Sequence, residues 1–299
     1  MAMGDERARG RVALVTGASS GFGLLTALTL GKSGFSVFAT VRSDDKKSEL
    51  VRAADAAAVE LQVLTMDLAK ADARSAAVRA VYDRAGRIDV LVNNAGYGLG
   101  GFAEDVSEEE LRQQFDTNFF GTVELTKLVL PGMRERRSGA VIVLSSMAGV
   151  VASPGVSSYC ASKFALEGYF DALNYELAPF DVNVSLIEPG QFRTRALTAY
   201  PVARRSELPS SAYFKLCEFI KALIAKRVAG LSSDPQDVAD LIARIALARS
   251  PRCRYAVGAD ARVFGFLQRF LPEMLFRGTL RTAIRLVYRR LERGGAAKP

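Results

Sequence analysis

The chain has 299 residues, of which 49% are hydrophobic, so it is long enough to bury one large core. It contains no histidine, and Cys160, Cys217 and Cys253 lie far apart, so we expect neither a metal site nor a disulfide framework. The net charge of +8 lies entirely in residues 252–299, which carry 11 Lys/Arg and 3 Asp/Glu, and this distribution argues against a nucleic-acid-binding fold. The charged start of the sequence and the absence of an apolar run of about 18 residues predict a cytoplasmic protein.

Strand and helix patterns alternate along most of the chain. Residues 11–16 are typical of a buried strand, residues 21–32 of a helix, and residues 35–40 of a second strand. Further strands are expected at 60–65, 88–93, 140–145, 182–187 and 254–257. Nearly continuous apolar strands such as 141–144 suit a parallel sheet that is covered on both faces. We therefore predict an α/β fold, a doubly wound parallel sheet of the Rossmann type, in one domain over residues 1–260.

A glycine-rich loop, Thr16 to Gly23, lies between the first predicted strand and the first predicted helix. Glycine permits a tight turn and lets backbone amides approach a pyrophosphate, and the N-terminus of the next helix adds partial positive charge. A plain turn would also explain the glycines, but the strand–loop–helix context favours a dinucleotide site. The candidate cofactor-binding residues of this loop are Gly17, Ser19, Ser20, Gly21, Phe22 and Gly23.

The tip of the second predicted strand carries Arg42. NAD-binding folds usually place a carboxylate here, about 20 residues past the glycines, to bind the adenosine ribose. An arginine instead favours the 2′-phosphate of NADP(H), and the Ser19 hydroxyl could add a second donor. We therefore expect NADP(H) rather than NAD(H). Two alternatives stay open: Asp44 or Asp45 reaches the ribose, or Arg42 is only a solvated side chain at a helix entrance.

Tyr159 and Lys163 are the candidate acid–base pair of a chain that has no histidine. In a helix, their spacing of four residues places both side chains on one face. A fixed ammonium favours the phenolate, so we expect Lys163 to lower a phenol pKa that is ordinarily near about 10. A tyrosine with a lowered pKa can transfer protons at physiological pH. Alone, this spacing is also common on ordinary helix surfaces.

Several ordered motifs between residues 11 and 194 together resemble the short-chain dehydrogenase/reductase family. Beside the glycine loop and the Tyr159/Lys163 pair, they are Asp67-Leu68, Asn93-Asn94-Ala95-Gly96, Asn118, Ser145-Ser146, Pro189-Gly190 and Thr194. The sequences of residues 159–168 and of the strand tip 39–42 are similar to those of the 17β-hydroxysteroid and retinol dehydrogenase branch. The resemblance implies an NAD(P)-dependent oxidoreductase acting on CH–OH groups.

The resemblance assigns catalytic roles to four residues. Tyr159 would be the general acid in reduction and the general base in oxidation. Ser146 would hydrogen-bond the substrate oxygen, with the neighbouring Ser145 as its competitor for that role. Lys163 would bind the nicotinamide ribose and tune Tyr159. Asn118 would help to hold a water in a proton relay, or it would simply bend its helix.

The resemblance also assigns cofactor contacts outside the glycine loop. Asp67 and Leu68 would meet the adenine ring. Asn93, Ala95 and Gly96 would line the two riboses, although Asn93 can be purely structural. The remaining contacts, around the nicotinamide, would come from Pro189, Gly190, Thr194, Tyr159 and Lys163. Members of the family are often dimers or tetramers built on two long helices, here 108–136 and 157–178, so a homo-oligomer is expected.

A helical insertion at about 195–230 should cover the active site together with residues 97–102 and 147–156. These stretches carry mostly apolar side chains near the expected reaction centre, which favours a hydrophobic alcohol or ketone such as a steroid, retinoid or lipid. The same side chains could instead be core; they are Tyr97, Leu99, Phe102, Val150, Val151, Leu197, Tyr200, Tyr213, Phe214 and Phe219. A 3-oxoacyl or small-carbonyl reductase and a non-catalytic nucleotide-binding scaffold or redox sensor are the alternatives.

Residues 261–299 read as a basic, amphipathic helical extension. Arginines recur every four residues beside an apolar stripe of Phe276, Leu280, Ile284, Val287 and Leu291; they are Arg277, Arg281, Arg285 and Arg289. Such a helix can lie on an anionic membrane, or it can pack on a partner subunit or on its own chain. Packing on protein is the interpretation we favour.

Overall fold

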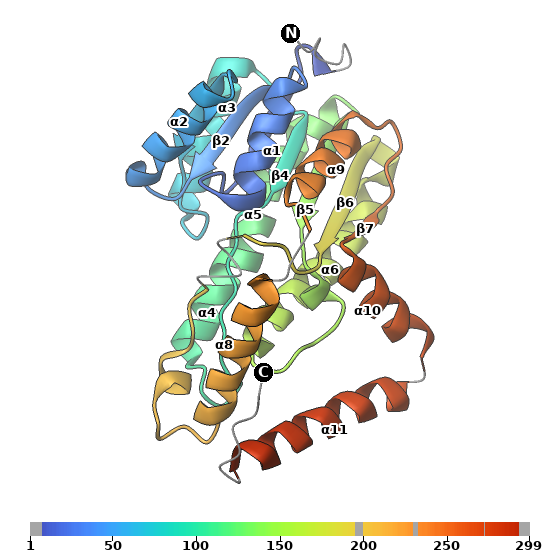
Figure 1. The fold of residues 1–299 in the computed structure, drawn as a ribbon. Coiled ribbons are helices and arrows are strands. Elements are labelled where there is room, and N and C mark those ends of the chain that lie inside the picture. Colours follow the sequence, from blue (N-terminus) through green and yellow to red (C-terminus); the bar gives the residue numbers. More distant parts are fainter. Residues whose placement is uncertain (1–7, 195–199, 230–232, 272, 293–299) are drawn as a thin grey trace.

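The centre of the computed structural model is a parallel sheet whose strands follow the order β3-β2-β1-β4-β5-β6-β7 (Figure 1). The strands are β1 (Val12–Val15), β2 (Ser36–Val41), β3 (Leu61–Thr65), β4 (Val90–Asn93), β5 (Gly139–Leu144), β6 (Val182–Pro189) and β7 (Arg254–Val257). The structure describes residues 8–194, 200–229, 233–271 and 273–292. Each predicted strand overlaps an observed one, and the predicted doubly wound sheet is confirmed.

Helices cover both faces of the sheet, and every residue of β1, β4 and β5 is therefore buried. One apolar core lies under α1 (Gly21–Lys32), α2 (Lys47–Ala56) and α9 (Gln236–Leu247). The other lies under α3 (Ala71–Ala85), α5 (Thr122–Glu135) and α6 (Ser157–Leu177). The two cores flank one sheet, so the fold is a single domain. Short helical turns complete the body at η2 (Asp44–Lys46), η4 (Met147–Gly149) and η5 (Ala178–Phe180).

The helix predicted over residues 108–136 is interrupted in the structure. It begins as α4 (Glu108–Phe115) with a capping box, in which the Glu110 amide donates to Ser107 Oγ and the Ser107 amide donates to Glu110 Oε2. It then widens into a π-helical segment, η3 (Asp116–Gly121), and continues as α5. Segments of this kind often occur at functional sites, and this one contains Asn118.

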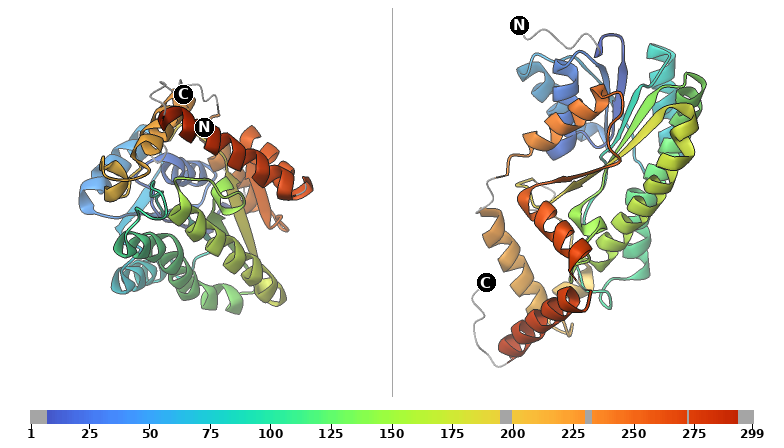
Figure 2. Two further views of the ribbon diagram at one scale, coloured as in Figure 1. Left: turned by 90° about the horizontal axis from the view of Figure 1, so that it is seen from below. Right: turned by 90° about the vertical axis from the view of Figure 1, so that its right-hand side faces the viewer.

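Beyond the carboxyl ends of the strands lies a second, helical region (Figure 2). It contains η6 (Arg204–Glu207), α8 (Phe214–Ala229), α10 (Ala259–Phe270) and α11 (Glu273–Glu292). α8 lies within the predicted helical insertion at about 195–230. Of the predicted insertion, residues 195–199, including Arg195 and Leu197, and Gly230 lie outside the described residues.

The apolar stripe of the tail helix packs on the protein itself. Ile284, Val287, Tyr288 and Leu291 of α11 pack against a small cluster formed by Phe102, Leu216 and Cys217. For Ile284, Val287 and Leu291, this packing agrees with the interpretation favoured from the sequence. Leu280 of the predicted stripe is instead exposed, and the side chain of Phe276 lies outside the described part. None of the described helices combines the length and the apolar character that a membrane span requires.

Candidate active site

The glycine-rich loop turns sharply between β1 and α1, and Gly17 and Gly23 leave no room for a side chain. Gly17 and Gly21 adopt positive φ angles of 67° and 57°. A Cβ atom on Gly17 would lie 2.8 Å from the Cα of Ala95, and one on Gly23 would lie 2.4 Å from the carbonyl oxygen of Gly17. The loop therefore holds its backbone close to the N-terminus of α1, which attracts an anionic group such as a pyrophosphate.

Asn94 pins this loop, a role that the sequence did not indicate. Its Nδ2 donates hydrogen bonds to the carbonyl oxygens of Thr16 and Gly17, at 2.8 and 3.0 Å. In turn, Thr16 Oγ1 accepts hydrogen bonds from the amides of Asn94 and Ala95, both at 2.9 Å. The turns after β1 and after β4 are thus fixed to each other. Asn94 belongs to the Asn-Asn-Ala-Gly motif, but from the sequence we expected cofactor contacts only from the other three residues of that motif.

The segment after β6 closes the other side of the glycine loop. The ring of Phe22 packs edge-on against the ring of Phe192, with centroids 5.4 Å apart. A Cβ on Gly21 would lie 3.8 Å from the Cβ of Thr194. The structure therefore brings Thr194 beside the loop, as a shared cofactor site requires. Ser19 and Ser20 of the loop are partly exposed.

Gly190 follows the buried Pro189 at the point where α10 approaches the site. A Cβ on Gly190 would lie 1.9 Å from Asp260 Oδ1, so no other residue fits without movement. Asp260 Oδ2 accepts a hydrogen bond from the amide of Gln191 at 2.7 Å. The first turn of α10 thus sets the position of this candidate cofactor segment, a connection that the sequence did not reveal.

Arg42 is exposed at the end of β2, close enough to Tyr97 to act on the pKa of its phenol. The two carboxylates that could take its place are engaged with neighbouring hydroxyls. Thr65 donates a hydrogen bond to Asp44, and Ser43 donates one to Asp45. The hydrogen bond from Ser43 is the largest cause that lowers the pKa of Asp45.

The other residues predicted to contact the adenosine, Asp67, Leu68 and Asn93, differ in solvent exposure. Asp67 is partly exposed, and its Oδ1 accepts a hydrogen bond from the Ala69 amide. The Leu68 side chain is buried in the second core. The Leu68 carbonyl is engaged as well, since it accepts a hydrogen bond from Arg74 Nη1 at 2.7 Å. Asn93 is buried too, and its Nδ2 donates to Thr126 Oγ1 at 2.9 Å, which ties β4 to α5 and supports its structural interpretation.

Asn118 lies in the π-helical segment and joins three parts of the site. Its Oδ1 accepts from the Tyr97 amide at 3.0 Å, and its Nδ2 donates to the Tyr97 carbonyl at 2.9 Å and to Ser162 Oγ at 3.1 Å. Ser162 in turn donates to the carbonyl of Tyr159. Gly96 lies above this group, because a Cβ there would be 3.1 Å from Asn118 Oδ1 and 4.0 Å from Lys163 Nζ.

The two candidate serines differ in their contact with Tyr159. The Ser146 hydroxyl forms a hydrogen bond with Tyr159 that lowers the pKa of the phenol. Ser145 is buried, and its Oγ would lie 2.8 Å from a Cβ on Gly149, beside the Glu167 side chain. Of the two hydroxyls, only that of Ser146 therefore faces the reaction centre. Tyr159 itself is partly exposed.

Lys163 lies one helical turn after Tyr159 and is buried, and its Nζ donates a hydrogen bond of 2.6 Å to the Leu144 carbonyl. Burial lowers the pKa of Lys163 to about 8, against a raising contribution from Glu167. The prediction that Lys163 lowers the pKa of Tyr159 is wrong for this structure. Burial raises the pKa of Tyr159, because loss of solvation outweighs the hydrogen bond from Ser146, and the ammonium lies 5.8 Å from the ring centroid.

A buried carboxylate, Glu167, lies one turn beyond Lys163 on the same helix. Burial raises its pKa to about 7, although the neighbouring Ser145 hydroxyl and the Arg254 guanidinium lower it. Arg254 of β7 pairs with Glu167, with Glu188 at 3.3 Å and with Asp171 at 3.2 Å. The catalytic face of α6 is thereby fixed to the edge of the sheet.

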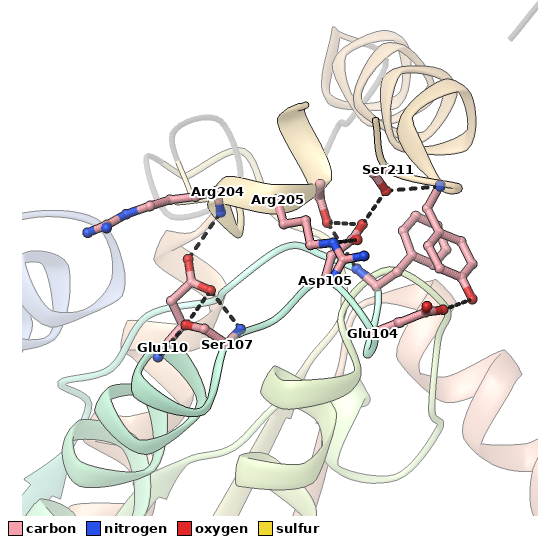
Figure 3. A network of polar contacts seen from close by, with 10 residues as sticks. Glu104, Asp105, Ser107, Glu110, Arg204, Arg205 and Ser211 are labelled. Carbon is pink, nitrogen blue, oxygen red and sulfur yellow. Dashed lines mark hydrogen bonds and ion pairs between the residues drawn. The ribbon is translucent and has the colours of Figure 1, made fainter. Parts of the chain in front are cut away.

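The helical insertion is anchored to the loop after β4 by a polar network (Figure 3). The buried carboxylate of Asp105 accepts hydrogen bonds from Ser211 Oγ at 2.6 Å and from Ser206 Oγ at 3.0 Å, and it pairs with Arg205 at 3.5 Å. At the edge of the network, Glu110 accepts from the Arg204 amide. No local pattern indicates this network, because its members lie about 100 residues apart.

Several residues that were expected to line the substrate pocket are instead packed in the core of this region. Leu99, Phe102 and Val151 are buried, and Phe102 stacks on Tyr213 with centroids 4.6 Å apart. The cavity between Phe102 and Tyr200 holds only about 10 Å³, room for about one water. The side chains of this set that stay partly exposed are Tyr97, Val150, Tyr200, Tyr213, Phe214 and Phe219.

The family model for short chain dehydrogenase matches residues 11–203. The chain belongs to the short-chain dehydrogenase/reductase family. This short-chain dehydrogenase is 36% identical to the 3-ketodihydrosphingosine reductase of Bacteroides thetaiotaomicron over 91% of this chain and 97% of that protein. It is 35% identical to human retinol dehydrogenase 8 over 82% of this chain and 80% of that protein.

Among solved structures, the short-chain dehydrogenase resembles a metagenomic short-chain oxidoreductase in complex with NADP. The TM-score is 0.67 and the identity 29%, over 84% of this chain and 98% of that chain. The protein is therefore an oxidoreductase that acts on CH–OH or carbonyl groups and uses a nicotinamide cofactor. The side-chain-free turn at Gly17 and Gly23 fits such a dinucleotide, because added Cβ atoms would fill the space beside the loop backbone.

Proposed function

We propose that the protein transfers hydride between NADP(H) and a hydrophobic secondary alcohol or ketone, with Tyr159 as the general acid and base. The observation that carries the proposal is the convergence of Ser146, Tyr159 and Lys163 between the glycine loop and an apolar insertion. The nicotinamide supplies the hydride in reduction and accepts it in oxidation. The protein supplies position and the proton.

In the proposed reduction, the phenol of Tyr159 gives its proton to the substrate oxygen. A phenol with a raised pKa is protonated at neutral pH, so it is ready to act as an acid. Ser146, which is hydrogen-bonded to Tyr159, holds the substrate oxygen beside the phenol. We assign Lys163 to the nicotinamide ribose, because its Nζ would lie 4.0 Å from a Cβ on Gly96 in the proposed cofactor segment. Asn118, through Ser162, holds the backbone of Tyr159 in place and offers a route for a replacement proton.

We assign the cofactor to the glycine loop, the Ala95–Gly96 backbone and the segment from Pro189 to Thr194. Preference for NADP(H) is supported by the exposed Arg42 at the tip of β2. It is supported also by the hydrogen bonds that Asp44 and Asp45 accept from Thr65 and Ser43, because these bonds occupy acceptor positions that would otherwise bind the ribose hydroxyls of NAD(H). Ser19 and Ser20 add hydroxyl donors at the turn.

The substrate class follows from the side chains that remain partly exposed around Tyr159. Tyr97, Val150, Tyr200 and Phe214 offer apolar and aromatic surface. A steroid, retinoid or long-chain lipid ketone fits this surface better than a charged sugar. The names of the relatives point the same way, since one reduces 3-ketodihydrosphingosine and another is a retinol dehydrogenase.

We also propose a homo-oligomer that forms through α5 and α6. Exposed large apolar residues recur on this side of the molecule and on the adjoining π-helical segment: Phe120, Leu128, Phe164 and Tyr175. Such a row on two neighbouring helices is typical of a subunit interface.

The test is a comparison of wild type with Tyr159→Phe. NADPH and NADH are titrated separately by fluorescence, and oxidation of NADPH is then followed with a panel of long-chain, steroid and small ketones. We expect wild type to bind NADPH more tightly and to reduce apolar ketones. In Tyr159→Phe, turnover should fall by about 10²–10⁴-fold while NADPH binding stays unchanged. Tyr169→Phe, on the same helix, is the control and should retain turnover.

Other outcomes would redirect the assignment. Tighter binding of NADH would contradict the role given to Arg42. Cofactor binding by wild type without turnover of any ketone would favour a nucleotide-binding scaffold. Turnover confined to small carbonyls or to thioester-linked 3-oxoacyl chains would replace the lipophilic substrate by those classes.

A further inference from the structure

The junction between α10 and α11 carries a group of large apolar side chains that project into solvent. We name the described residues of this junction, 263–271 and 273–275, the elbow. Phe270 is 66% exposed and Met274 is 82% exposed, values that soluble proteins rarely leave on a surface in a group. The other exposed apolar residues of the elbow are Val263, Phe264, Phe266, Leu271 and Leu275.

The elbow is not needed to hold the two helices on the body. α11 packs on α8 through the stripe that contains Ile284 and Leu291. α10 is held at its first turn, where Asp260 bonds to the Gln191 amide. The elbow lies at the far end of both attachments and projects from the body (Figure 1). Within the elbow, the rings of Phe266 and Phe270 lie 4.6 Å apart, so they form one apolar surface.

Arginines lie along both helices that meet at this apolar surface. Residues 261–292 contain seven arginines and two acidic residues. Arg262, Arg281 and Arg285 of these helices are exposed. A convex apolar surface with arginines beside it is the combination by which peripheral proteins bind anionic bilayers, because the apolar groups enter the lipid while the cations stay at the head groups.

We propose that the elbow binds the surface of an anionic lipid bilayer. The charge decides against the other plausible occupant, a second copy of the chain. In a two-fold contact the same surface meets itself, so the arginines of two elbows would approach one another and repel. A bilayer rich in anionic lipid instead attracts every one of them. The proposal concerns the lipid surface alone, and it does not depend on the reaction or on the substrate.

The experiment measures binding of the full-length protein to vesicles by co-sedimentation. Vesicles of pure phosphatidylcholine are compared with vesicles that contain three parts phosphatidylcholine and one part phosphatidylglycerol. We expect binding to the anionic vesicles, weakening as salt is raised, and at least about tenfold weaker binding to the neutral ones. Phe270→Ser combined with Leu275→Ser should lower partition into anionic vesicles by at least about tenfold. Arg281→Glu combined with Arg285→Glu should do the same.

Two controls separate the elbow from general surface effects. Val51→Ser changes an exposed apolar residue on α2, at the opposite end of the molecule, and Arg79→Glu changes an exposed arginine on α3. Both should bind like wild type. Failure of wild type to bind anionic vesicles, or equal binding by the elbow variants, would overturn the proposal. Loss of a dimer in the elbow variants, without vesicle binding by wild type, would assign the surface to a second copy. Circular dichroism of each variant checks that it is folded.

Discussion

The buried ammonium of Lys163 destabilises the folded protein at neutral pH. Its ammonium is buried and its pKa is lowered from the usual 10.5 to about 8, so the folded state holds the charged form reluctantly at neutral pH. Below pH 8 the lysine is charged in both the folded and the unfolded state, and the full penalty applies. As the pH rises from 8 to 10.5 the folded state releases its proton first, and the penalty disappears.

We predict that Lys163→Met is more stable than wild type at pH 7 while it loses activity. Removal of the buried charge should stabilise the variant by about 3 kcal/mol, which is the energy of the pKa shift. Loss of the hydrogen bond to Leu144 should destabilise it by about 1 kcal/mol, so we expect the free energy of unfolding to rise by about 2 kcal/mol. Urea unfolding at several pH values measures it. The difference between the two proteins should close between pH 8 and 10.5. A constant difference across that range would show that the ammonium is not the cause.

Some residues of the candidate site are positioned by local spacing, and others by contacts with distant segments. Tyr159, Lys163 and the loop glycines could be predicted because their spacing along one helix or one turn fixes their geometry. Asn94 and Asp260 could not be assigned from the sequence, because their partners are carbonyls and amides of distant segments. The pKa of Tyr159 was predicted in the wrong direction, since its burial depends on tertiary packing that spacing does not encode.

At the scale of elements, the insertion depends on one buried carboxylate. Asp105 lies in the loop after β4, and both Ser206 before α8 and Ser211 donate to it. Ser206 Oγ also accepts from the Phe102 amide, so one network joins η6 and α8 to the loop beside the active site (Figure 3). A shift of this network would move the apolar surface that is proposed to receive the substrate.

We predict that Asp105→Asn raises KM for apolar ketones by about tenfold and leaves NADPH affinity unchanged. Ser206 and Ser211 both donate to Asp105 Oδ2, while Oδ1 pairs with Arg205. Loss of the negative charge turns two charge-assisted hydrogen bonds into neutral ones and removes the ion pair, at a cost of about 1–3 kcal/mol that loosens the insertion. Steady-state kinetics with separate NADPH titration measure both effects. Glu104→Gln is the matched control, because its bond to the Tyr213 hydroxyl is exposed and should contribute little. Equal changes in KM and in NADPH affinity would indicate general unfolding instead.

The elements themselves were predictable where local pattern and tertiary context agree. The apolar runs of β1, β4 and β5 suit only a doubly covered sheet, and α1 matches its predicted bounds. The π-helical segment at 116–121 was missed because its sequence is compatible with ordinary helix. Its cause is tertiary: Asn118 bonds to the backbone of Tyr97, and a Cβ on Gly121 would lie 2.4 Å from the Leu68 carbonyl.

At the scale of the whole molecule, apolar burial is unevenly distributed. The two clusters that flank the sheet each contain 24 buried residues in the described part of the chain, whereas the cluster between α8 and α11 contains three. Stability follows buried apolar area, so these regions should open at different free energies. The sheet and its covering helices hold the cofactor segments, and the helical region holds the proposed substrate surface.

We therefore predict that α8 and α11 exchange their backbone amide hydrogens much faster than β4 and β5. Their opening requires the loss of only a small cluster, while exchange in the central strands requires global unfolding. Hydrogen exchange followed by mass spectrometry measures this difference, and protection in the strands should exceed that in α8 by at least about 100-fold. Leu216→Ala should accelerate exchange in α8 and α11 but leave β4 unchanged, because Leu216 belongs to the small cluster alone. Equal protection in all four elements would mean that the helical region and the sheet unfold as one cooperative unit, and the insertion would then be too rigid to open for a bulky substrate without unfolding of the core.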